Sequence, residues 1–144
     1  MKKKKIVIIG AGVSGLLCGK RLTEAGYSVL LIDKGRNVGG RLSTRRTDDA
    51  IFHHGASSLP DFYKHKDLPK FGLEMLKRAE REKIIQRKGD LFEPVSSVSD
   101  LVSFFAANLK IQEGCEATTL NLHSMTIDVK LRNNNHKEIP YDFL

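Results

Sequence analysis

Three glycines near the amino terminus have the spacing of a dinucleotide phosphate site. The segment Gly10-Ala11-Gly12-Val13-Ser14-Gly15 follows a continuous apolar run and opens a helical pattern. Gly10 permits a tight turn off a strand, Gly12 leaves the backbone open to a pyrophosphate, and Gly15 allows a helix to pack closely on the sheet. The start of that helix presents unpaired N–H groups and partial positive charge to phosphate oxygens. The pattern therefore predicts a nucleotide-binding β-α-β unit.

Asp33 stands at the end of the next apolar run, where the second strand of such a unit ends. Its carboxylate can accept hydrogen bonds from a ribose 2′-hydroxyl. A 2′-phosphate would be repelled at the same place, because both groups are negatively charged. The acid therefore favours FAD or NAD over NADP as the ligand.

Residues 34–46 form a second segment that is rich in glycine and in positive charge. Gly39 and Gly40 are adjacent there, and the basic residues of the segment are Lys34, Arg36, Arg41, Arg45 and Arg46. Glycine permits close approach of the backbone to a ligand, and basic side chains favour an anion. Arg41 can supply a charge-assisted hydrogen bond to a phosphate. We therefore expect a loop or helix start beside the phosphates.

The elements that position these residues can be predicted from apolar periodicity and turn residues. Two helices have recognisable starts, with Pro69 in the first turn of one and a capping box from Ser97 to Asp100 before the other. The predicted elements are strand 6–9, helix 14–25 ended by Gly26, strand 28–32, hairpin 44–47 with 50–53, an irregular stretch 61–69, helix 70–83, hairpin 84–88 with 91–95, helix 101–109, and strands 117–122, 126–132 and 137–144.

This order predicts an α/β protein with a Rossmann-like fold, in which an antiparallel β-meander completes a parallel sheet. Residues 1–49 are expected to form the dinucleotide-binding unit, residues 50–96 to start a substrate-facing subdomain, and residues 97–144 to return to the first unit. The last strand gains apolar character just where the chain stops. We therefore expect a fold that is incomplete at the carboxyl terminus, with a sheet edge able to recruit a second chain or to self-associate.

The composition excludes several other classes of protein. The chain has 144 residues, a formal net charge of +7 and two cysteines. No apolar run approaches the length of a membrane span and the start lacks a secretory signal pattern, so we expect a cytoplasmic protein without a membrane partner. The basic residues lack interleaved aromatics, which argues against nucleic acid. The histidines lack the spacing of metal ligands, and Cys18 is expected to pack as a small apolar residue.

The combined motifs resemble those of one flavoprotein family. Gly39-Gly40-Arg41-Leu42-Ser43-Thr44, placed shortly after Asp33, resembles the Gly-Gly-Arg-x-x-[Ser/Thr] signature of FAD-dependent amine-oxidase-like proteins. The wider string 33–46 is most similar to the renalase-like branch. His54-Gly55-Ala56 stands where that branch has Asp-His-Gly-Ala-Gln. The match spans nearly all of this chain but only about the first half of a typical family member.

The resemblance implies a role for each matching position. The first glycine segment would line the FAD pyrophosphate, Asp33 would hold the adenosine ribose, and the strand near Ala117 would meet the adenine. The flavin ring would lie near His54, and the second glycine segment would approach the pyrophosphate and ribityl chain. The candidate FAD contacts are Gly10, Ala11, Gly12, Val13, Ser14, Gly15, Asp33, Lys34, Gly39, Gly40, Arg41, Leu42, Thr44, Gly55, Ala56 and Ala117.

The leading hypothesis is the FAD-binding, amino-terminal part of a flavin-dependent oxidoreductase. The resemblance implies hydride transfer from a small molecule to FAD and reoxidation by oxygen, but it assigns no catalytic residue. The chain departs from the family at His53, Ser57 and Ser58, near the reacting face of the flavin. One alternative is a non-catalytic or split nucleotide-binding module that needs a partner chain. An NAD-dependent dehydrogenase module is less favoured, because it has no need of the Gly39-Gly40-Arg41 motif.

Overall fold

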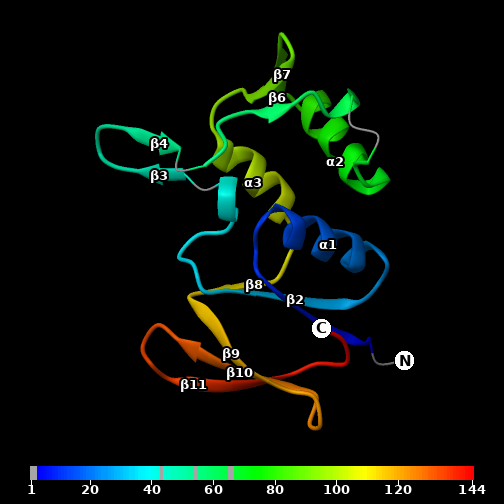
Figure 1. Cartoon of the computed structure of the whole chain (residues 1–144), viewed down its shortest axis with the longest axis vertical. Helices are drawn as coiled ribbons and strands as arrows, with labels where there is room; N and C mark the ends of the chain where they lie inside the picture. The colour runs from blue at the N-terminus through cyan, green and yellow to red at the C-terminus, as the bar shows by residue number, and fades with distance from the viewer. Residues whose placement is uncertain (1–2, 43, 54, 65–66) are drawn as a thin grey trace. The chain divides into compact units, whose positions relative to one another are not determined.

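The structure is a computed structural model that describes residues 3–42, 44–53, 55–64 and 67–144, with the backbone alone for residues 45, 46, 51 and 53. Contacts divide the chain into two compact units (Figure 1). The first unit comprises residues 1–40 and 108–144, and the second comprises residues 41–107. The second unit therefore includes the helix that begins after Ser97, which the sequence places with the meander.

The first unit is built on a three-stranded parallel sheet. Its strands β1 (Lys5–Ile9), β2 (Ser28–Asp33) and β8 (Ile111–Glu113) lie in the order β1-β2-β8. Helix α1 (Val13–Glu24) connects β1 to β2 and packs on one face of the sheet. Gly26 follows the helix with φ of +90°, as expected for a glycine just past a helix end. The predicted β-α-β unit is thus confirmed.

An antiparallel meander packs on the parallel sheet within the same unit. Strands β9 (Cys115–Asn121), β10 (Thr126–Leu131) and β11 (His136–Pro140) lie in the order β11-β10-β9. The core between the two sheets consists of residues from both, namely Val7, Ile32, Cys115, Ile127, Val129, Ile139 and Tyr141. The predicted meander is therefore confirmed, although β11 ends at Pro140 instead of running to Leu144.

The described residues of the second unit form short strands, α-helices and turns of 3-10 helix. A short helix, η1 (Gly40–Leu42), leads into it from the first unit. Its sheets have the pairings β3-β4 and β5-β7-β6. The elements are β3 (Thr44–Arg46), β4 (Ile51–His53), β5 (Leu59–Pro60), η2 (Phe62–Lys64), α2 (Lys70–Arg81), β6 (Ile85–Lys88), β7 (Leu91–Pro94) and α3 (Val98–Ala106).

Both predicted hairpins and both predicted helices of the second unit are present. The stretch 61–69 is less irregular than expected, because Asp61 organises it. Its buried carboxylate accepts a hydrogen bond from the Tyr63 N–H at 3.1 Å and a short one from the Arg87 guanidinium. Two aromatic rings pack beside this pair, with the Phe62 and Phe92 centroids 4.3 Å apart. An ion pair and an aromatic contact thus fix a turn that lacks an apolar period.

Candidate functional site

The turn from β1 into α1 has the geometry that its glycines predict. Gly10 has φ of +102°, a conformation that side chains rarely adopt, and its N–H donates to the Ile32 carbonyl at 2.8 Å. A Cβ on Gly15 would lie 2.0 Å from the Gly10 carbonyl oxygen. A side chain there would force the helix away from the strand. Gly10 and Gly15 are therefore required by the protein's own backbone.

Gly12 differs from these two glycines, since nothing in its own surroundings excludes a side chain. Its φ is −73°, which any residue can adopt, and a Cβ built on it would meet no atom within 4 Å. The open space lies at the N-cap of α1. A glycine in open space at a helix start is what a closely approaching ligand requires.

The first turn of α1 has no negative side chain of its own. No side chain caps the start of the helix either. The first N–H groups of a helix have no partner within the helix and carry part of the helix dipole. Ser14 lies exposed in this turn. The arrangement can hold an anion with backbone N–H groups alone.

Asp33 links the turn to the end of β2. Its Oδ2 accepts a hydrogen bond from the Ala11 N–H at 2.6 Å, and its Oδ1 accepts one from the Gly35 N–H at 2.7 Å. The carboxylate therefore shapes the glycine turn before any ligand binds. This structural role was missed by the sequence reasoning, which assigned Asp33 to a ribose. The two roles are compatible, because each carboxylate oxygen can accept a second hydrogen bond.

The second glycine pair lies directly against the first turn. The Gly39 N–H donates to the Ala11 carbonyl at 2.8 Å, and Gly39 forms an isolated parallel bridge with Gly12. A Cβ on Gly40, which has φ of +56°, would be 3.3 Å from the Gly12 Cα. The two motifs singled out in the sequence thus meet at one place in the first unit. Lys34 and Arg36 lie exposed on the loop that connects them.

Ala117 occupies a different position in the first unit. It lies on β9 opposite Val129, beside a register shift at which the Thr118 hydroxyl donates to the Asp128 carbonyl at 3.0 Å. Ala117 is half-buried and packs against the core between the two sheets. The start of the meander is tied to the end of β2, because the Gly114 N–H donates to the Gly35 carbonyl at 2.8 Å. The strand of Ala117 thus begins close to the loop after Asp33.

The remaining candidate contacts belong to the second unit. The Ala56 N–H donates to the Arg41 carbonyl at 3.0 Å, and a Cβ on Gly55 would lie 1.7 Å from the same oxygen. Leu42 is buried and Thr44 begins β3. Arg41 and the Gly55-Ala56 pair are therefore neighbours. Ser43 and His54 lie outside the described residues.

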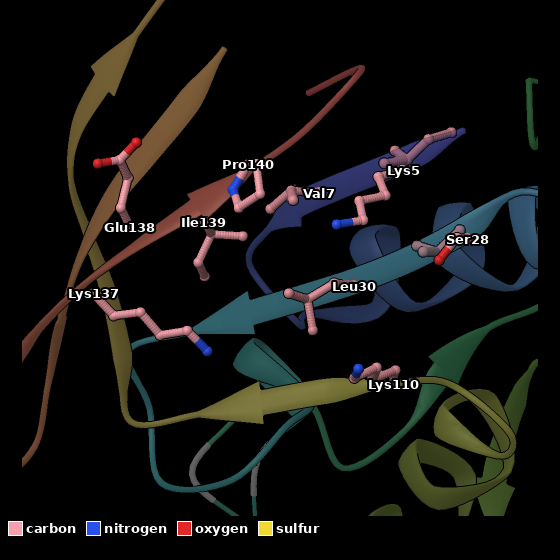
Figure 2. Close-up of a pocket in the computed structure, with 11 residues that line it drawn as sticks. Lys5, Val7, Ser28, Leu30, Lys110, Lys137, Glu138, Ile139 and Pro140 are labelled. Carbon is pink, nitrogen blue, oxygen red and sulfur yellow. The ribbon is translucent and has the colours of Figure 1, made fainter. Parts of the chain in front are cut away.

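A groove in the first unit lies at the other end of the parallel strands (Figure 2). It is lined by the starts of β1 and β2 and by β11, including Lys5, Ser28, Leu30 and Ile139. Ligands of open α/β sheets bind outside the carboxyl ends of the strands, where Gly10 and Asp33 lie. This groove is therefore not the candidate nucleotide site.

The two cysteines differ in burial, and one of them is not placed as expected. Cys18 is exposed on α1, so the expectation that it packs as an apolar residue was wrong. Cys115 is buried, and burial raises the pKa of its thiol although Lys137 acts in the opposite direction.

Among the described residues, no group of three or more potential ligands could hold a metal ion. None of the helices described is long and apolar enough to cross a membrane.

Part of the chain is similar in sequence to a known domain class. Residues 8–71 match the sequence model of the NAD(P)-binding Rossmann-like domain. A stretch of 71 residues is 44% identical to the L-glutamate oxidase precursor of Streptomyces diastatochromogenes and covers 42% of this chain and 11% of that protein. A stretch of 62 residues is 40% identical to the 4,4'-diapophytoene desaturase (4,4'-diaponeurosporene-forming) of Staphylococcus aureus strain Newman, covering 42% and 12%.

Solved structures share the fold over most of the chain. The PF1083 protein from Pyrococcus furiosus matches 96% of this chain and 57% of its own, with a TM-score of 0.65. A flavoprotein/dehydrogenase from Cytophaga hutchinsonii matches 96% of this chain and 37% of its own, with a TM-score of 0.56. Both are 15% identical in sequence, so they support the Rossmann-like fold alone. The chain spans only a small part of the curated relatives and little more than half of PF1083.

Proposed function

We propose that this chain is the FAD-binding part of a flavin-dependent oxidoreductase of the amine-oxidase-like type, similar to the renalase-like branch. One observation carries the proposal. Gly39 and Gly40 lie against Gly12 at the uncapped start of α1, and Asp33 holds the same turn from β2. A phosphate-binding turn that is braced by a second glycine pair suits a dinucleotide diphosphate. The sequence likeness to an oxidase and a desaturase agrees with redox chemistry.

The residues of the first unit would hold FAD by its adenosine diphosphate half. Backbone N–H groups at the start of α1 would bind the pyrophosphate, and the missing side chain of Gly12 would let it approach. Asp33 would accept a hydrogen bond from the ribose, with Lys34 beside it. Bound FAD would supply the capacity to accept a hydride from a reduced small molecule. The contribution of these residues is position and electrostatics.

Titration of the purified chain with FAD, followed by flavin fluorescence, tests the proposal. We expect saturable binding by the wild-type chain. Gly12→Val should weaken binding by about tenfold or more, because a side chain would occupy the path of the pyrophosphate. Cys18→Val is the matched control, since it adds a similar side chain at an exposed position on the same helix. Equal FAD affinity in both variants would contradict the proposal.

NAD is the second candidate ligand, because the matched domain class is described as NAD(P)-binding. The adjacent pair Gly39 and Gly40 favours FAD, since the resemblance that carries this pair is to flavoproteins. Parallel titrations with FAD and NAD separate the two, with thermal stabilisation as a common readout. Tighter binding of NAD than of FAD would favour the dehydrogenase module. Weak binding of both would favour a split module that needs a partner chain.

A further inference from the structure

The groove at the amino ends of the parallel strands opens between the two sheets of the first unit (Figure 2). Its volume is about 180 Å³, and its lining residues come from β1, β2, β11 and the position just before β8. All of them lie in residues 1–40 and 108–144, which form one compact unit. The groove is therefore a feature of the first unit alone.

The floor of this groove is apolar. Val7 and Ile139 belong to the core between the two sheets, and Leu30 packs against that core. Figure 2 shows the three side chains around the groove. An apolar cavity of about 150 Å³ in a protein can hold a benzene ring. The groove therefore has room for one ring on an apolar surface.

Three lysines line the same groove, namely Lys5, Lys110 and Lys137. Lys137 lies directly opposite the buried Val129, so it shares the inner face of the meander. Lys5 shares the inner face of β1 with Val7, which stands two residues further on. Among the residues that the structure describes, no carboxylate forms an ion pair with any of the three lysines. The groove thus combines an apolar floor with positive charge that is not balanced by an ion pair.

The charge of Lys137 acts toward the inside of the unit. Burial raises the pKa of the Cys115 thiol and the Lys137 ammonium lowers it, so the ammonium lies close enough to act on a core group. Glu138 also lines the groove, but it pairs with Asp128 on the outer face of the meander. Figure 2 shows its carboxylate pointing away from the groove. An acid at this position therefore leaves the inner face positive.

We propose that this groove binds a small aromatic carboxylate, with its ring on Val7, Leu30 and Ile139 and its carboxylate directed toward the lysines. Ligand sites combine apolar walls with a few polar groups that fix orientation. An ammonium beside a ring adds a cation–π attraction, which favours an aromatic body over an aliphatic one. The groove lies at the opposite end of the strands from Gly10 and Asp33, so this site goes beyond the proposed nucleotide site.

The wild-type chain is titrated with 3-phenylpropionate in the absence of any nucleotide, and amide shifts are followed by NMR. We expect saturable shifts of the Val7, Leu30 and Ile139 amides, with a dissociation constant of about 1 mM for so small a ligand. Two matched compounds separate ring from charge. Propionate lacks the ring and 3-phenylpropylammonium reverses the charge, and each should bind about tenfold more weakly or less. Equal binding of 3-phenylpropylammonium would overturn the proposal.

Two lysine variants test the position of the charge. Lys137→Met removes the ammonium, keeps most of the stem and should raise the dissociation constant about twofold to fivefold. Lys130→Met is the matched control, because Lys130 follows Val129 and lies on the outer face of β10. Equal affinity in the two variants would overturn the proposal, as would shifts of the wild-type chain that centre on Gly12. No nucleotide is present, so a failure of FAD binding leaves these outcomes unaffected.

Discussion

At the scale of single residues, the glycines of the first turn differ in the atoms that an added side chain would meet. Gly15 faces the protein's own backbone, whereas Gly12 faces open space. The close packing at Gly15 was predicted from the spacing of the motif, which reflects a fixed turn, and the approach of a pyrophosphate to Gly12 stays a prediction. The partner of Gly39 and Gly40 could not be derived in the same way. Their contact with Gly12 joins segments more than 20 residues apart, and no local propensity encodes it.

Gly15→Ala and Gly12→Ala should therefore have different effects on stability. The alanine at position 15 would place a methyl group 2.0 Å from the Gly10 carbonyl oxygen, so the helix must shift. We expect a loss of about 1–3 kcal/mol in the free energy of unfolding, as for other overpacked sites. Gly12→Ala should change stability by less than about 0.5 kcal/mol. Urea unfolding monitored by circular dichroism measures both, and equal losses would refute the distinction.

Asp33 carries a role that its type and position did not reveal. The motif predicts that Asp33 binds a ribose. Its hydrogen bonds to the backbone could not be predicted, because they depend on where the Ala11 and Gly35 N–H groups lie in the fold. Asp33→Asn keeps the shape of the side chain and replaces one accepting oxygen by an NH₂ group. We expect a loss of about 1–3 kcal/mol in stability without nucleotide, because a backbone N–H loses a charged acceptor. Asp49→Asn, at an exposed position in the second unit, is the control. A stable Asp33→Asn variant with weakened FAD binding would assign the acid to the ligand alone.

The two cysteines should differ in reactivity and in pH dependence. Burial raises the pKa of the Cys115 thiol, so its thiolate forms only at higher pH than usual. Cys18 is exposed on α1. Iodoacetamide should modify Cys18 first, and modification of Cys115 should need alkaline pH or unfolding. Mass spectrometry of peptides after timed labelling at several pH values checks this order. Because the unfolded thiol loses its proton first, Cys115 should also lower stability as the pH rises above its ordinary pKa.

At the scale of elements, periodic segments and hairpins with turn residues were predictable, whereas a short strand with a non-local partner was not. Helix α2 and the meander have clear periodicity and turn residues, including Asn134 with φ of +62°. Strand β8 escaped prediction, because three residues give no period and its pairing with β2 is non-local. Helix α3 ends at Ala106 rather than residue 109, because Ala107 leaves the helical conformation with ψ of 129° and Asn108 follows with φ of +65°. Both misses occur where the chain returns to the first unit.

Helix α3 depends on the capping box that its sequence predicts. The Asp100 carboxylate accepts hydrogen bonds from the Ser97 N–H and the Ser97 hydroxyl, each at 3.1 Å. Asp100→Ala removes both, and we expect a loss of about 1 kcal/mol in stability. Ser103→Ala, on the exposed side of the same helix, should have almost no effect. Thermal unfolding of the two variants compares them directly, and equal melting temperatures would show that the cap contributes little.

At the scale of the whole molecule, the chain's two ends meet at the edge of one sheet. The amino-terminal strand carries the nucleotide turn, and the last residues of the chain cover the first half of its outer edge. The apolar ending was visible in the sequence, but its parallel pairing with β1 was not. Ile6 and Phe143 are more than 130 residues apart in the sequence. Their pairing therefore depends on how the meander, which precedes Phe143, packs on the parallel sheet.

Deletion of residues 142–144 tests how far this edge supports the first unit. The deletion removes the hydrogen bonds between Phe143 and β1 and the contact of Asp142 with the Lys5 N–H. We expect faster exchange of the Val7 amide and a loss of about 2–4 kcal/mol in stability, as the sum of these backbone bonds suggests. Amides of β7 in the second unit should exchange unchanged, because the lost bonds all lie in the first unit. Faster exchange in β7 as well would mean that the two units unfold together and that the edge stabilises the molecule as one cooperative body.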